Sequence, residues 1–166
     1  MANLASFDIT SRVDLQEVDN AVNQARKEIA QRYDFKGSTA SIDFNKAEST
    51  LTLAAEDQMK INALWDVLQT RMVRRNVPIK NLKLGDVETA SGSSVRRVIT
   101  LQQGIPGDAA RDIIKFLKDQ KLKKVQPSIQ GDQLRISSAS KDELQDVIRL
   151  LRGHDFGIDL QFGNYR

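Results

Sequence analysis

The sequence contains no cysteine and a single histidine, His154. Without cysteine the chain can form no disulfide, no thiolate nucleophile and no cysteine metal site. One histidine cannot build a usual catalytic zinc site or a two-histidine acid–base pair. A glycine-rich phosphate loop followed by lysine and serine or threonine is also missing. We therefore expect no enzyme, no metal ion and no cofactor, although a metal held by carboxylates alone stays open at this point.

Long apolar runs are missing as well. No stretch approaches the roughly 18 residues of a membrane span. The first residues lack a basic segment followed by an apolar one, so we expect a cytoplasmic protein without a secretory signal or membrane contact. The 166 residues are 40% hydrophobic and 28% charged, as is ordinary for a globular protein. A formal charge of +3 permits an anionic partner but does not require one.

The apolar pattern predicts the same order of elements twice: strand, helix, a hairpin of two strands, helix, strand. The first copy spans 7–10, a helix from 14, 41–44, 50–53, a helix from 57, and 79–84; the second spans 98–102, a helix from 108, 125–130, 133–137, a helix from 140, and 158–162. This is the order of the ferredoxin-like fold, in which two helices cover one face of an antiparallel sheet. We predict an α+β protein with two ferredoxin-like (βαββαβ) domains in tandem, joined by an exposed connection at 85–94.

The other face of each predicted sheet is open and polar, because side chains alternate along a strand. Gln126, Gln130 and Arg135 fall on the open face of one sheet, and Arg96 falls on that of the other. No open-face position is aromatic, so a stacked base would need an arginine or a loop residue. The plain alternative is a solvated polar face that binds nothing.

A further candidate lies in the loop after the first helix. Gly37 can turn the backbone so that Lys36 meets a phosphate, while Phe35 is expected in the core. Lys36, Arg96, Arg135, Gln126 and Gln130 are therefore the candidate ligand-binding residues.

Basic residues also gather around the third predicted helix, opposed only by Asp112 and Asp119. They are Arg111, Lys115, Lys118, Lys121, Lys123 and Lys124. Such a run can neutralise phosphates along an extended nucleic acid. The commoner alternative is a solvated helix face.

Five segments resemble the YajQ family of bacterial nucleotide-binding proteins, and the resemblance covers the whole chain in order. They are SFDI at 6–9, LQEVDNA at 15–21, RYDFKG at 32–37, VQPSIQGD at 125–132 and LQFGNYR at 160–166. One departure concerns a glycine–lysine pair usual after the last hairpin strand, where this chain has Ser138-Ala139-Ser140-Lys141.

The resemblance implies that the two domains exchange their N-terminal strands. One domain would comprise residues 14–104, including the strand near 95–102, and the other residues 1–13 with 105–166. It also implies a non-enzymatic nucleotide-binding protein, and cyclic di-GMP binding is reported for some members. Two alternatives remain open: an RNA-binding protein that uses the basic helix and the polar sheet faces, and an interaction module for a protein regulator.

Overall fold

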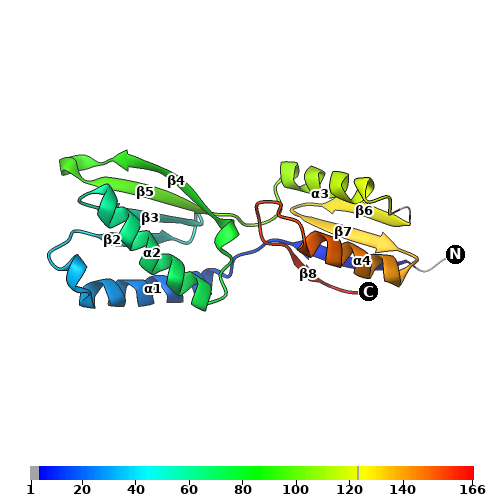
Figure 1. Cartoon of the computed structure of the whole chain (residues 1–166), viewed down its shortest axis with the longest axis horizontal. Coiled ribbons are helices and arrows are strands. Elements are labelled where there is room, and N and C mark those ends of the chain that lie inside the picture. Colours follow the sequence, from blue (N-terminus) through cyan, green and yellow to red (C-terminus); the bar gives the residue numbers. More distant parts are fainter. Residues whose placement is uncertain (1–3, 123) are drawn as a thin grey trace. The chain divides into compact units, whose positions relative to one another are not determined.

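The computed structural model describes residues 4–122 and 124–166 and divides the chain into two compact units. Unit 1 holds the N-terminal residues to Arg12 together with Gln103–Arg166, and unit 2 holds Val13–Gln102. Each unit contains a four-stranded antiparallel sheet and two α-helices (Figure 1). The predicted α+β class with two ferredoxin-like folds is confirmed. Lys123, one of the predicted basic residues, lies outside the described residues.

Unit 2 has its strands in the order β2-β3-β5-β4, and every neighbouring pair is antiparallel. Its elements are α1 (Leu15–Gln31), β2 (Ser41–Asn45), β3 (Thr50–Ala55), α2 (Gln58–Arg74), β4 (Leu82–Thr89) and β5 (Val95–Leu101). Both helices begin where the sequence predicted. The Asp14 carboxylate accepts hydrogen bonds from the first backbone N–H groups of α1, and Asp57 does the same for α2.

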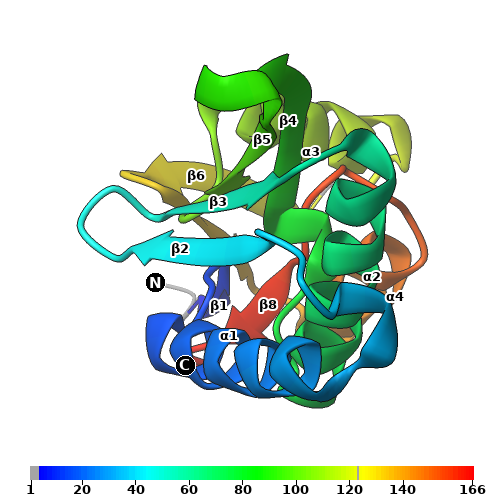
Figure 2. The same ribbon diagram turned by 90° about the vertical axis from the view of Figure 1, so that its left-hand side faces the viewer.

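The core of unit 2 lies between the sheet and the two helices α1 and α2, which contact each other (Figure 2). The helices contribute Val18, Ala21, Val22, Ala25, Ile61, Leu64, Leu68 and Met72, and the strands contribute Leu51, Leu53 and Ile99. Phe35 is only 5% exposed and packs in this core, which confirms the prediction for it. The opposite face of the sheet carries the polar side chains.

The prediction of an exposed connection at 85–94 is wrong. Residues 82–89 form β4, and a short turn at Ser91–Ser93 leads directly into β5, so this segment is a hairpin within unit 2. The register shifts between Leu84 and Val87, and such a bulge breaks the alternation that marks a strand in the sequence. Gly85 belongs to this irregularity, because a Cβ atom there would lie 2.8 Å from the carbonyl oxygen of Val98.

Unit 1 has its strands in the order β6-β7-β1-β8. Its elements are β1 (Ala5–Thr10), α3 (Gly107–Asp119), β6 (Val125–Gln130), β7 (Gln133–Ser138), α4 (Lys141–Arg152) and β8 (Gln161–Gly163). The predicted tight hairpin between β6 and β7 is confirmed. The last strand differs from the predicted 158–162, because the chain meets β1 only from Gln161, opposite Thr10, while Ile158 is buried ahead of the strand.

Strand β1 is the centre of unit 1. It pairs with β7 on one side and β8 on the other, and its Phe7 and Ile9 enter a core shared with α3 and α4. In unit 2, β5 holds the equivalent position between β3 and β4. The strand exchange implied by the family, and the domain bounds 14–104 and 1–13 with 105–166, stay predictions that fragments can test.

We predict that unit 2 cannot fold without β5. A fragment of residues 13–94 lacks the strand that pairs on both sides and supplies Ile99 and Leu101 to the core. It should be unfolded by circular dichroism and NMR, whereas a fragment of residues 13–102 should unfold cooperatively. Cooperative unfolding and dispersed NMR signals from the shorter fragment would contradict the prediction.

Candidate binding surfaces

The predicted ligand-binding residues are divided between the two units. Arg135, Gln126 and Gln130 lie together on the sheet of unit 1, whereas Lys36 and Arg96 belong to unit 2. The described basic residues lie on α3 or just after it. The predicted residues therefore fall on three surfaces.

The first surface is the side of the unit 1 sheet that faces away from α3 and α4, which we call the polar face. Strand register places Ser128, Arg135 and Asp8 in one row, and Gln126 and Ser137 in the next. The polar face consists of Ser6, Asp8, Thr10, Gln126, Ser128, Gln130, Gln133, Arg135, Ser137 and Gln161. The alternation of the strands thus brings three of the five predicted residues onto one face.

An ion pair between Asp8 and Arg135 occupies the middle of the polar face. The Nε and Nη2 atoms of Arg135 donate to the two Asp8 carboxylate oxygens at 2.8 and 3.3 Å. Asp8 is only 5% exposed, and it also accepts a hydrogen bond of 2.6 Å from the Asn164 side chain. Because the carboxylate holds one edge of the guanidinium, the plane of Arg135 is fixed and its Nη1 atom takes no part in the pair.

The pKa values of the pair are displaced in opposite directions. The hydrogen bond from Arg135 lowers the pKa of Asp8 most strongly, burial opposes this, and the hydrogen bond from Asn164 lowers it further. The hydrogen bond to Asp8 likewise raises the pKa of Arg135. Both groups are therefore charged near neutral pH, and the centre of the polar face carries little net charge.

The partner that sequence reasoning missed is Asn164. Its backbone adopts a φ of 53°, in the left-handed region where asparagine is more frequent than most residues. The Gly163-Asn164 dipeptide is a turn signal that pointed to this position. Gly163 itself lies opposite Asp8 and has no side chain, so a shallow depression of about 250 Å³ opens beside the carboxylate.

The second surface is the loop of unit 2 that carries Lys36. Gly37 has a φ of 74°, so the backbone turns here as predicted, and Lys36 is exposed. The preceding residues are held firmly: Arg32 forms ion pairs with Asp34 and Glu28 at 2.7 and 3.3 Å. Within the described part of the chain Lys36 itself forms no ion pair, so it remains available to an anion.

Arg96 lies on the open face of the unit 2 sheet, as predicted from the alternation. It forms an ion pair of 3.2 Å with Glu88, its neighbour on β4, and both side chains are more than half exposed. An exposed pair of this kind contributes little stability and separates readily. Arg96 therefore differs from Arg135, whose partner is buried.

The third surface, the basic stripe, follows α3. Arg111, Lys115 and Lys118 are exposed at spacings of four and three residues, so they share one side of the helix, and exposed Lys121 and Lys124 follow its end. None of these five forms an ion pair with the described residues.

Aromatic rings lie next to the basic stripe, which the sequence did not predict. The ring centroid of His154 lies 4.5 Å from the ring centroids of Phe116 and Phe156. These three side chains and Lys115 line one hollow on the surface. The single histidine thus belongs to an aromatic cluster. Across residues 4–122 and 124–166, no group of three or more histidine or carboxylate side chains is placed to hold a metal ion.

Comparison with known proteins identifies the family. Residues 5–166 match the model of a family described as "Nucleotide-binding protein YajQ-like". The chain belongs to this family. The resemblance of the five short segments is therefore confirmed over nearly the whole sequence.

Relatives of the same family match this chain over almost the full length of both proteins. A nucleotide-binding protein of Bdellovibrio bacteriovorus is 52% identical over 163 residues, which cover 98% of this chain and 99% of that protein. One of Geotalea uraniireducens is 51% identical with the same coverage, and one of Koribacter versatilis is 50% identical over 97% of this chain and 96% of its own. Among the described helices of this YajQ-like chain, none is long and apolar enough to span a bilayer.

We predict that the buried carboxylate of Asp8 stabilises unit 1 in a pH-dependent way. Its pKa is lowered on folding, so its contribution is complete above the ordinary aspartate pKa of about 4 and is lost as the pH falls below that value. Asp8→Asn should lower the free energy of unfolding at pH 7 by roughly 1–3 kcal/mol, and its difference from wild type should shrink in acid.

Urea titration followed by NMR signals of unit 1 measures this difference at each pH. Glu88→Gln is the matched control, because it removes a carboxylate from an exposed ion pair and should change stability little at any pH. A difference between Asp8→Asn and wild type that stays constant from neutral to acid pH would contradict the assigned role.

Proposed function

We propose that the protein binds a nucleotide without catalysing a reaction on it, and that the base lies on the polar face of unit 1 around Arg135. Its relatives in the YajQ-like family are named as nucleotide-binding proteins. The observation that carries the location is the fixed guanidinium of Arg135, surrounded by uncharged hydrogen-bonding side chains.

The chemistry of the polar face suits a base better than a lone phosphate. A guanidinium held in one plane is a surface on which a base can stack. The carboxamides of Gln126 and Gln130 each offer donors and an acceptor to the edge of a base. Because Asp8 balances the charge of Arg135, the attraction for a phosphate alone is weakened.

Guanine is the base that this arrangement favours. Arginine binds guanine O6 and N7 through two parallel N–H donors, and the edge of Arg135 formed by Nη1 and the second N–H of Nη2 is not engaged by Asp8. Cyclic di-GMP, which carries two guanines, is therefore the first ligand to test. A mononucleotide such as GMP is the simpler alternative.

We predict that Arg135→Lys and Gln126→Ala each weaken binding of cyclic di-GMP roughly tenfold in a calorimetric titration. The lysine keeps the charge but loses the planar group, so the change reports on stacking and paired donors. Gln31→Ala, the same type of change on α1 of unit 2, is the control and should bind as wild type.

Lys36 and Arg96, the candidate binding residues in unit 2, show which result would contradict this assignment. Lys36→Ala and Arg96→Ala should leave the affinity for cyclic di-GMP unchanged if the polar face is the site. If these variants lose binding while Arg135→Lys and Gln126→Ala keep it, the nucleotide binds in unit 2 and the assignment to Arg135 is wrong.

A second candidate function is binding of single-stranded RNA along the basic stripe. Five exposed cations that form no ion pair with the described residues follow α3, and one of them, Lys115, lines a hollow with the rings of Phe116, His154 and Phe156. Cations along a backbone track with aromatic rings for the bases are the parts that single-strand binding uses. Asp112 and Asp119 flank the same hollow and limit where phosphates can lie.

For RNA, we predict that affinity falls linearly against salt on logarithmic axes, with each phosphate contact contributing about −0.7 to the slope. Lys118→Gln combined with Lys121→Gln should reduce the slope by roughly two contacts, measured by fluorescence anisotropy with a labelled single strand. Lys27→Gln, an exposed lysine on α1, should leave the slope unchanged. Equal slopes for the double variant and wild type would mean that the stripe is only a solvated helix face.

Two further expectations from the sequence stay predictions: a protein regulator as partner, and a cytoplasmic location.

A further inference from the structure

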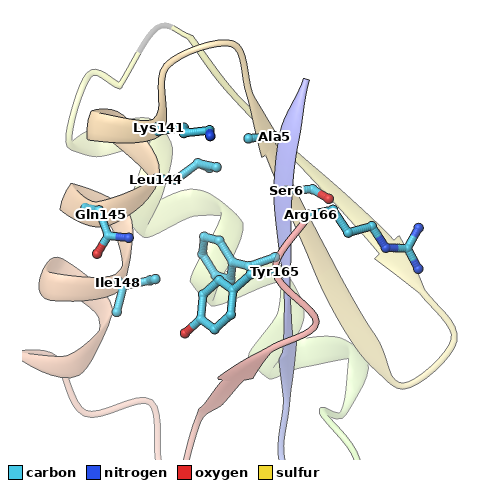
Figure 3. Close-up of a pocket in the computed structure, with 9 residues that line it drawn as sticks. Ala5, Ser6, Lys141, Leu144, Gln145, Ile148, Tyr165 and Arg166 are labelled. Atoms are coloured by element: carbon cyan, nitrogen blue, oxygen red, sulfur yellow. The ribbon is translucent and has the colours of Figure 1, made fainter. Parts of the chain in front are cut away.

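A pocket of about 330 Å³ lies on the helix side of the unit 1 sheet, and Ser6 at its edge is the one residue that it shares with the polar face (Figure 3). It opens between α4, the start of β1 and the last residues of the chain. Its walls include Phe7, Leu144, Ile148 and Tyr165, with Lys141 and Gln145 among the polar residues. We call it the tail pocket.

Hydrogen bonds at the end of the chain place Tyr165 on this pocket. Asn164 turns the backbone with a φ of 53° while its side chain donates to Asp8 on the opposite face of the sheet. The next residues continue along β1, where the backbone groups of Ser6 and Arg166 bond in both directions at 3.2 and 2.9 Å. Tyr165 is therefore fixed from both sides along the chain.

The ring of Tyr165 is positioned but largely uncovered. Its centroid lies 6.2 Å from that of Phe7, yet the residue is 61% exposed. A tyrosine ring at a surface offers a large apolar area beside a polar hydroxyl, which is why tyrosine is enriched at interfaces. The ring offers a flat wall to a molecule that enters the pocket.

The opposite wall of the pocket is apolar, and its mouth carries a cation. Leu144 and Ile148 on α4 are apolar, and in Figure 3 they point from the helix toward β1. Lys141, one turn earlier on the same helix, points across toward Ala5. Lys141 is exposed and forms no ion pair with any described residue.

We propose that the tail pocket is a second binding site, which takes a planar aromatic group carrying a negative charge. The aromatic group lies between Tyr165 and the apolar side of α4, and its anion lies toward Lys141. The volume is near the lower end for ligand cavities, so it fits a molecule of one or two rings. This site is separate from the nucleotide site proposed at Arg135, because Phe7 and Asp8 point to opposite faces of β1.

The test uses naphthoate as a two-ring aromatic anion and follows the full-length protein by NMR titration. Naphthoate should shift the amide signals of Gln145 and Ile148 with a single binding constant. Tyr165→Leu should weaken binding roughly tenfold or more, and Tyr165→Phe, which keeps the ring, should restore it. Lys141→Gln should weaken naphthoate roughly threefold to tenfold but leave the neutral analogue naphthylmethanol unchanged.

Matched controls separate this pocket from other surfaces. Tyr33→Leu changes the other tyrosine, which is 88% exposed in unit 2, and Gln126→Ala changes the polar face; both should bind naphthoate as wild type. Binding of naphthoate by Tyr165→Leu with wild-type affinity would overturn the proposal. So would equal affinities for naphthoate and naphthylmethanol in the wild-type protein, because the cation would then play no part.

Discussion

The ion pair between Asp8 and Arg135 connects nearly every feature of unit 1. It joins residues that are 127 positions apart in the sequence and locks the central strand β1 to β7. The same carboxylate accepts from Asn164, so it also fixes the turn from which the last residues run back along β1. Because burial of an unpaired carboxylate is costly, removing the Arg135 side chain would disturb the polar face and, through Asn164, the turn that leads to the tail pocket.

Alternation along β1 explains how one strand can serve two surfaces. Phe7 and Ile9 enter the core, and Phe7 also forms a wall of the tail pocket, while Asp8 between them lies on the opposite face. Asn164 and Tyr165 divide between the two faces in the same way. A ligand on one face and a ligand on the other would thus contact neighbouring residues of the same two segments without sharing a cavity.

Local signals in the sequence predicted most of the fold. Asp14, Asp57 and Ser140 all cap helices where predicted, because a side chain next to free N–H groups acts within a few residues. The bulge near Gly85 was missed, since its cause is the close approach of Val98 from another strand. Arg135, Gln126 and Gln130 could be placed on one face from a period of two. Their central partner, Asp8, depends on a pairing over long range that no local pattern encodes.

The distribution of charge in unit 1 differs between the two proposed binding surfaces. On the polar face the only ion pair is internally balanced as far as the described residues show, so selectivity there has to come from hydrogen bonds and flat surfaces. On the basic stripe the described cations form no ion pair with any described residue, so an anion bound there would be held electrostatically and would bind more weakly as salt rises. A base is a suitable ligand for the first arrangement and a phosphate backbone for the second. A compact nucleotide and an extended RNA would therefore use different residues, and neither has to displace the other.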